Sequence, residues 1–182
     1  MAPAWRPYPA LPDSTVTGDL RQLDGVFSPQ LGNTRHLLAW LPPSYEASPE
    51  RRYPVVYLHD GQNLFDAATS FSGQWRVDGE WRVDESMTRL AAEGLEAIVV
   101  GIPNAGDDRP LEYSAHRHSI LGGGRAPDYV RFLAETVKPP VDATLRTLPG
   151  REDTTVAGSS LGGLVSLRAL FDRPDVFSRA GV

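Results

Sequence analysis

The 182-residue chain contains no cysteine, which excludes disulfides, thiolate metal sites and a cysteine nucleophile. It also has no uninterrupted apolar stretch of about 18 residues, the length that a membrane-spanning helix needs, so we expect no membrane insertion. Residues 1–9 are rich in proline and hold no apolar core of a signal peptide. We therefore expect a cytoplasmic protein.

An excess of positive charge is missing as well, since the formal net charge is −5. Domains that bind nucleic acids usually present a basic face, so we expect no nucleic-acid partner. His116 and His118 have a spacing that could bind a metal, but no third ligand follows in a recognisable pattern. We expect no metal and no cofactor. With 41% apolar and 23% charged residues, the composition is that of one ordinary globular domain.

Turn-forming residues separate the first 54 positions into an N-terminal arm and two strand-like segments. Residues 1–14 carry four prolines and are predicted to form an extended, poorly constrained arm, followed by one domain over 15–182. Residues 15–27 and 34–41 are predicted to form antiparallel strands, because the residues between them favour a turn.

Three later runs, at 55–58, 97–102 and 154–158, are short, β-branched and free of charge. Such runs are typical of parallel strands that are buried on both faces. Helical patterns occupy 83–93 and 127–137, and Lys138-Pro139-Pro140 is predicted to break or kink the second before helical character resumes at 141–145. The alternation predicts an α/β fold with helices on both faces of the sheet.

The third run leads into Gly158-Ser159-Ser160-Leu161-Gly162-Gly163, which fits the pattern G-x-S-x-G only with Ser160 at its centre. In this strand-turn-helix context the serine sits on a strained backbone that lifts its hydroxyl out of the sheet. We expect a side chain at Gly158 or Gly162 to collide with its neighbours. The helix start would aim backbone N–H groups, including that of Leu161, at a developing oxyanion.

The alternative is a glycine-rich helix start that carries an ordinary exposed serine. The apolar run before the motif and the amphipathic pattern after it favour the nucleophile. After the first buried run, residues 59–63 read His-Asp-Gly-Gln-Asn. Alone, this segment fits either a plain turn at a strand end or the loop that supplies a second oxyanion N–H.

Four segments together resemble the Putative esterase family of α/β-hydrolases. They are residues 57–66, the Trp81-x-Val83-Asp84-Glu85 stretch, residues 98–104 and the serine motif. That group is similar to enterochelin esterases, esterase D, and the feruloyl and acetyl-xylan esterases. The likeness runs from about residue 17 to the last residue, and the His-Asp-Gly-Gln-Asn stretch is its most specific part.

The resemblance implies a three-layer α/β-hydrolase sandwich and a serine carboxylic-ester hydrolase that works through an acyl-enzyme on siderophore, sugar-acyl or simple acyl esters. It assigns the second oxyanion N–H to Gln62, beside that of Leu161. For Arg109 a plain surface salt bridge remains the alternative. The residues that the resemblance places against the substrate are His59, Asp60, Gly61, Arg109 and Tyr113.

The usual triad order is serine, acid, histidine, yet all four histidines precede Ser160. We expect the fold to lack its C-terminal strands, with the chain ending in a strand that starts near Arg179. Three explanations stay open: a fragment of a longer gene product, a base supplied by the upstream His59, or a non-catalytic binding module. We expect this chain alone to be nearly inactive and its exposed strand edge to favour self-association.

Overall fold

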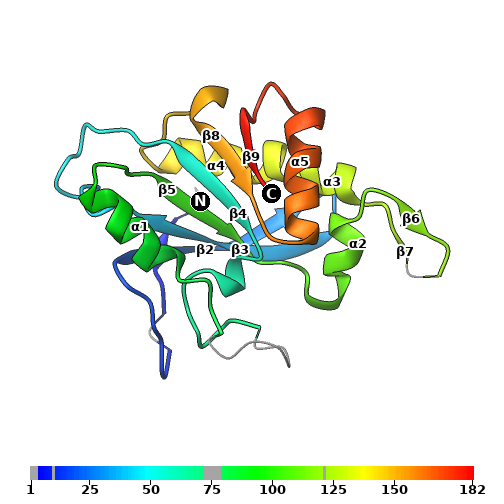
Figure 1. Ribbon diagram of the computed structural model, residues 1–182, viewed down its shortest axis with the longest axis horizontal. Helices are drawn as coiled ribbons and strands as arrows, with labels where there is room; N and C mark the ends of the chain where they lie inside the picture. Colours follow the sequence, from blue (N-terminus) through cyan, green and yellow to red (C-terminus); the bar gives the residue numbers. More distant parts are fainter. Residues whose placement is uncertain (1–3, 10, 72–78, 121) are drawn as a thin grey trace.

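The computed structural model describes residues 4–9, 11–71, 79–120 and 122–182. Within them, a seven-stranded sheet runs in the order β1-β2-β3-β5-β4-β8-β9 (Figure 1). The first three strands and β5 pair antiparallel, whereas β5, β4, β8 and β9 run parallel. The strands are β1 Arg6–Pro7, β2 Asp19–Ser28, β3 Asn33–Leu41, β4 Val55–His59, β5 Ile98–Ile102, β8 Thr154–Ala157 and β9 Arg179–Gly181. This confirms the predicted, mostly parallel sheet with antiparallel N-terminal strands.

Helices connect the parallel strands, as the alternating pattern predicts. Short 3-10 turns η1 Gly61–Asn63, η2 Gly106–Asp108 and η4 Arg151–Asp153 lie in the loops. A two-stranded hairpin, β6 Arg117–His118 and β7 Gly122–Gly123, projects from one side (Figure 1). The longer helical elements are α1 Val83–Ala92, α2 Arg109–Tyr113, α3 Ala126–Arg131, η3 Phe132–Val137, α4 Lys138–Thr144 and α5 Leu161–Asp172.

The sheet buries apolar side chains on both faces because successive residues of a strand point to opposite sides. On β5, Val100 joins a core with side chains of α3, η3, α4 and α5, whereas Val99 joins a second core with α1. Buried Tyr57 and Val156 extend the first core across β4 and β8. Two helical layers therefore enclose the sheet, which fixes where its strand tips emerge.

Of the two outcomes predicted at Lys138-Pro139-Pro140, a break is wrong, whereas the helix does become irregular next to it. The helical path continues from Ala126 to Thr144, with a π-helical segment, η3, directly before Lys138. Pro139 and Pro140 then occupy the first turn of α4, where a missing N–H costs little. The wider π-helical turn before Lys138 accommodates the two prolines, because it avoids the clash between a proline ring and the carbonyl one turn earlier in a regular helix.

The N-terminal segment is tied to the domain. Within the predicted arm, β1 pairs with β2, and the Trp5 indole N–H donates to Thr144 Oγ1 at 2.8 Å. The strand predicted from residue 15 begins only at Asp19. Hydrogen bonds to the buried carboxylates of Asp66, Glu80 and Asp84 hold Ser14, Thr15 and Thr17.

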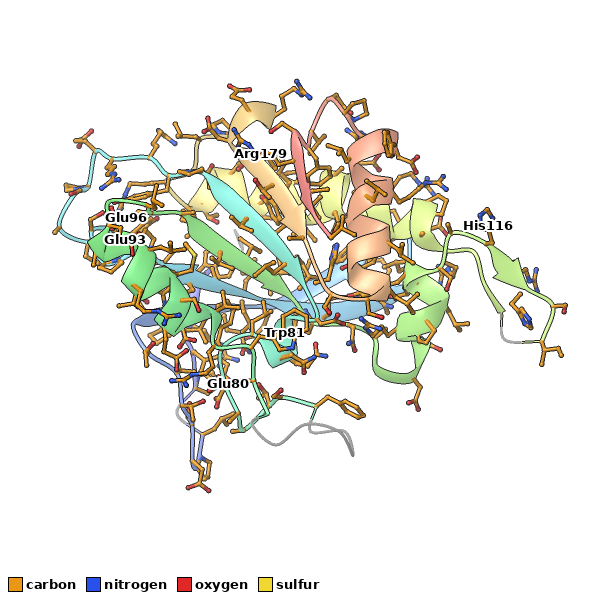
Figure 2. All side chains as sticks on the ribbon, viewed as in Figure 1. Glu80, Trp81, Glu93, Glu96, His116 and Arg179 are labelled. Atoms are coloured by element: carbon orange, nitrogen blue, oxygen red, sulfur yellow. The ribbon has the colours of Figure 1, made fainter. Side chains whose placement is uncertain are left out.

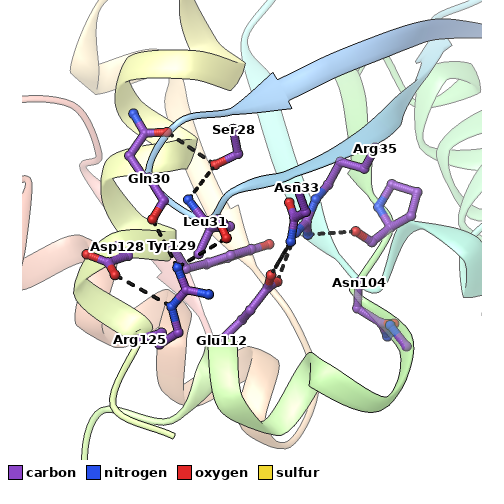
Figure 3. A network of polar contacts seen from close by, with 12 residues as sticks. Ser28, Gln30, Leu31, Asn33, Arg35, Asn104, Glu112, Arg125, Asp128 and Tyr129 are labelled. Atoms are coloured by element: carbon purple, nitrogen blue, oxygen red, sulfur yellow. Dashed lines mark hydrogen bonds and ion pairs between the residues drawn. The ribbon is translucent and has the colours of Figure 1, made fainter.

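A buried ion pair fastens α2 to the sheet. The Arg35 guanidinium on β3 donates to Glu112 of α2 at 2.8 and 3.0 Å, and to the Pro103 carbonyl at 3.1 Å. Asn33 also donates to Glu112 (Figure 3). Glu112 is therefore a structural anchor, and it holds α2 beside the tip of β5. No helix among the described residues has the length and apolarity needed to cross a membrane.

Candidate active site

Two loops meet at the carboxyl edge of the sheet. β4 and β8 are parallel neighbours, with Leu58 opposite Ala157. The segments that follow them, residues 59–63 and residues 158–163, therefore emerge side by side. Ligands of open α/β sheets bind at this edge.

Ser160 has the strained backbone that its motif predicts. Its φ is 59° and its ψ is −122°, and its side chain is exposed. A positive φ in a residue other than glycine costs free energy and is concentrated at functional sites. Helix α5 begins directly after it, and the Leu164 N–H donates to the Ser160 carbonyl at 3.2 Å. The serine thus stands at the N-terminus of a helix, where backbone N–H groups lack intrahelical partners.

At the bend around Ser160, Gly158 leaves no room for a side chain, as the motif predicts. A Cβ built there would lie 2.8 Å from His59 Cδ2 and 2.9 Å from the Gly162 carbonyl carbon. The expectation for Gly162 is wrong, because a Cβ there would meet its nearest atom, Asp60 Oδ2, at an ordinary 3.5 Å. The tighter helical position is Gly163, whose Cβ would lie 3.2 Å from the Gly158 carbonyl oxygen.

The 59–63 segment forms a compact turn. Asp60 has a left-handed backbone, with φ 58° and ψ 44°, and the Asn63 N–H donates to its carbonyl at 2.8 Å. Gly61 packs directly on β5, since a Cβ there would lie 2.7 Å from Pro103 N and 2.8 Å from the Gly101 carbonyl carbon. Only a residue without a side chain lets this loop approach the neighbouring strand so closely.

Gln62 and Ser160 lie on the same cavity, which has a volume of about 540 Å³. The Gln62 side chain does not point freely into it: Oε1 accepts a hydrogen bond from the Asn104 N–H at 3.1 Å. This bond ties the loop after β4 to the loop after β5. The cavity is lined by Asp60, Gln62, Asn63, Phe71, Trp81, Asn104, Gly106, Asp107, Arg109, Pro110, Ser159 and Ser160.

Arg109 and Asp60 form an ion pair at the cavity wall. Arg109 Nε and Nη2 donate to the two carboxylate oxygens of Asp60 at 2.6 and 2.7 Å, and the Asn104 side-chain amide donates to the same carboxylate at 2.7 Å. The Asp60 side chain is 1% exposed and that of Arg109 is 24% exposed. The hydrogen bond from Arg109 to Asp60 is the main cause that raises the pKa of Arg109.

His59 and Tyr113 lie behind the cavity wall. Both are buried, with ring centroids 5.5 Å apart, and His59 Nδ1 is 3.0 Å from the Tyr129 hydroxyl. Burial lowers the pKa of His59 to about 4, so the imidazole is neutral at pH 7. Neither residue lines the cavity, and Gly61 is likewise buried against β5. Of the five residues that the resemblance places against a substrate, only Asp60 and Arg109 line the cavity.

The other candidate groups are distant from this arrangement or engaged elsewhere. His118 is exposed on β6, His116 is exposed beside that strand (Figure 2 labels His116), and His36 is on β3. Among the residues that the structure describes, no imidazole hydrogen-bonds to Ser160 and no cluster fits a metal ion. Asp172 pairs with Arg168 at the far end of α5.

Trp81, Phe71 and Asn104 line the cavity, although the sequence analysis gave none of them a role at the site. Trp81 and Phe71 reach the cavity from the long loop after β4, where the Trp81 N–H donates to the Asn63 carbonyl at 2.7 Å (Figure 2). No periodic pattern marks them. Asn104 follows β5 by two residues, and its position at the carboxyl end of a parallel strand could have identified it.

Two curated proteins are similar to this chain in sequence. The chain is 29% identical over 134 residues to a siderophore triacetylfusarinine C esterase from Aspergillus fumigatus, covering 68% of this chain and 41% of that protein. It is 24% identical over 165 residues to the uncharacterized protein YbbA of Bacillus subtilis, covering 87% of this chain and 60% of that protein. The chain thus spans about half the length of these curated relatives.

Among solved structures, an IroE-like serine hydrolase from Shewanella oneidensis superposes with a TM-score of 0.68 at 25% identity, covering 88% of this chain and 49% of that one. This likeness confirms the α/β-hydrolase fold. The family model described as Putative esterase matches residues 28–182, which include both loops of the candidate site. The chain belongs to the Putative esterase family.

Proposed function

We propose that this chain carries the nucleophile and oxyanion hole of a serine carboxylic-ester hydrolase. The observation that supports this most directly is the exposed Ser160, held at φ 59° at a helix N-terminus and sharing a cavity with Gln62. In the proposed reaction, Ser160 Oγ attacks the ester carbonyl carbon, and the N–H groups of Leu161 and Gln62 stabilise the oxyanion. Collapse of this intermediate breaks the ester C–O bond, and the leaving oxygen departs as the alcohol with the proton that the Ser160 hydroxyl gave up. The acyl-enzyme that remains is hydrolysed by water, which restores the Ser160 hydroxyl and releases the acid.

The relatives and the cavity support a proposal for the substrate class. The Aspergillus relative is named as a siderophore esterase. Polar amides and aromatic side chains both line the cavity here, namely Asn63, Asn104, Phe71 and Trp81. We propose small-molecule esters of the siderophore, sugar-acyl or simple acyl type. A cytoplasmic location and self-association through the edge of β9 also stay predictions.

We propose that the chain alone reacts slowly. A serine hydroxyl is a weak nucleophile at neutral pH without an adjacent base, and no described imidazole hydrogen-bonds to Ser160. The oxyanion hole and substrate binding still contribute: in serine proteases they leave about 10³–10⁴-fold catalysis over water when a triad residue is removed. A non-catalytic binding module would lack even this residual reactivity.

Incubation with a fluorophosphonate probe, followed by peptide mass spectrometry, tests the proposal. We expect slow labelling of Ser160 that Ser160→Ala abolishes. Ser159→Ala is the matched control, because Ser159 is also exposed and lines the same cavity. That variant should keep at least about half of the wild-type rate, since it removes no oxyanion donor. Labelling of Ser159 in place of Ser160, or no labelling above the Ser160→Ala background, would contradict the enzyme and favour the binding module.

A further inference from the structure

One side chain connects the two loops that carry the proposed oxyanion N–H groups. Arg109 holds the carboxylate of Asp60 through Nε and Nη2, and the same Nη2 donates to the carbonyl of Ser159 at 3.4 Å. Asp60 lies two residues before Gln62, and Ser159 lies two residues before Leu161. The guanidinium therefore connects one loop to the other at the wall of the cavity.

The contacts of Arg109 leave it little freedom. Its guanidinium carbon lies 5.0 Å from the centroid of the Tyr113 ring, and its first turn of helix is anchored through the buried Arg35–Glu112 pair. A planar guanidinium can donate along two edges at once, which a lysine ammonium cannot do with the same geometry. The pairing with Asp60 also satisfies a carboxylate that is almost fully buried.

The pairing with Arg109 helps to hold the left-handed backbone conformation of Asp60. Residues other than glycine rarely adopt φ near 58°, so surrounding contacts must hold the conformation. Arg109 and Asn104 donate three hydrogen bonds to the Asp60 side chain. If they were lost, we expect the turn to relax and the Gln62 N–H to move.

We infer that Arg109 is a positioning residue, which sets the separation between the Gln62 and Leu161 N–H groups by holding Asp60 against the Ser159 carbonyl. This inference rests on the proposed function of the site. It differs from the sequence-based expectation, in which Arg109 contacts the substrate directly. A displacement of about 1 Å at a site of this kind can lower a rate by about 10²-fold.

The experiment compares Arg109→Met, Arg109→Lys and a control, Arg131→Met, which removes an arginine from a surface pair with Asp128. Saturation kinetics of fluorophosphonate labelling separate the binding constant KI from the maximal rate kinact. We expect Arg109→Met to lower kinact by about 10²-fold with KI within about twofold of wild type. Arg109→Lys should recover part of the loss, and Arg131→Met should change neither constant.

A second readout does not depend on reactivity. In ¹H–¹⁵N spectra, we expect the amide signals of both Gln62 and Leu161 to shift in Arg109→Met, to shift less in Arg109→Lys, and to stay in place in Arg131→Met. Unchanged Leu161 and Gln62 amides in a folded variant would overturn the inference, even if the wild-type chain proves unreactive and the proposed function fails. A raised KI with unchanged kinact would also overturn it, in favour of direct substrate contact. If Arg109→Met does not fold, Arg109→Lys decides by the same two readouts.

Discussion

The tips of β4 and β8 carry residues with almost the same unusual backbone angle, but the two are stabilised differently. Asp60 has φ 58° and Ser160 has φ 59°. The Asp60 side chain is buried and accepts hydrogen bonds from Arg109 and Asn104. Ser160 is exposed on the cavity, and its strained backbone is held by the helix that begins after it and by the close approach at Gly158.

The difference indicates that the loop after β4 and the loop after β8 are stabilised for different purposes. Side-chain hydrogen bonds hold the β4 tip, and in the proposed function they keep its backbone N–H group in place. At the β8 tip, the contacts are the start of α5, the packing at Gly158 and the bond from Arg109 to the Ser159 carbonyl, and they leave the Ser160 side chain exposed. A reactive group must stay unpaired in this way, whereas a supporting group gains from being fully paired.

The largest expected effect is at the β4 tip, with Gly61→Ala. The added Cβ would lie 2.7–2.8 Å from backbone atoms of β5, which cannot move without disturbing the sheet. We expect the free energy of unfolding to fall by about 3–5 kcal/mol, measured by urea denaturation. Gly150→Ala is the control, because there the new Cβ would meet only the flexible end of Glu152. Equal losses in the two variants would show that Gly61 is not sterically required.

A smaller effect concerns the buried imidazole of His59, which packs against Gly158. Burial lowers the pKa of His59 to about 4 from 6.5, so as the pH falls the unfolded chain takes up this proton before the folded chain does. The contribution of His59 to stability is therefore complete above about pH 6.5 and is lost as the pH falls towards 4. The loss amounts to about 3 kcal/mol, because each pKa unit corresponds to about 1.4 kcal/mol.

Urea denaturation at pH 7, 5.5 and 4 measures this dependence. In His59→Gln we expect a shallower decrease in unfolding free energy between pH 6.5 and 4 than in the wild type. His116→Asn, which replaces an exposed histidine, should keep the wild-type slope. An unchanged slope in His59→Gln would mean that another group dominates this pH range.

The sheet and the bend at Ser160 were largely predictable from sequence because their signals are local. The β-branched runs located β4, β5 and β8 to within one residue, and the glycine spacing located the bend between β8 and α5 at Ser160. The fate of Pro139 and Pro140 was not predictable, since it depends on a π-helical segment whose side chains pack into the core.

The remaining differences in the site arise from contacts between distant positions. Asp60 and Arg109 are 49 residues apart in sequence, so no local pattern indicated that they pair. Burial of His59 and Tyr113 depends on α3, which supplies Tyr129 against both rings. A residue type at a strand tip therefore indicates the location of a site, but not whether its side chain faces the cavity or the core.

The smallest expected effects, with opposite signs, come from placing glycine at each of the two strained positions. Glycine adopts positive φ without steric cost. Ser160→Gly should therefore raise the free energy of unfolding, by about 1 kcal/mol, because the exposed serine side chain makes few compensating contacts. Asp60→Gly should lower it by about 2 kcal/mol, since Arg109 would lose its partner and this loss exceeds the relief of strain.

Urea denaturation of both variants beside Ser159→Gly tests this contrast. Ser159 has no positive φ, so glycine there should cost up to about 1 kcal/mol through the greater entropy of the unfolded chain. If Ser160→Gly is destabilised as much as Ser159→Gly, the bend at Ser160 stores no strain. If Asp60→Gly is stabilised like Ser160→Gly, the ion pair with Arg109 does not hold the β4 tip, and the difference between the two loops lies only in their exposure. If Ser160→Gly is stabilised and Asp60→Gly is destabilised, the backbone strain at Asp60 is offset by its ion pair with Arg109. The strain at Ser160 is then not offset by side-chain contacts, and its hydroxyl stays unpaired.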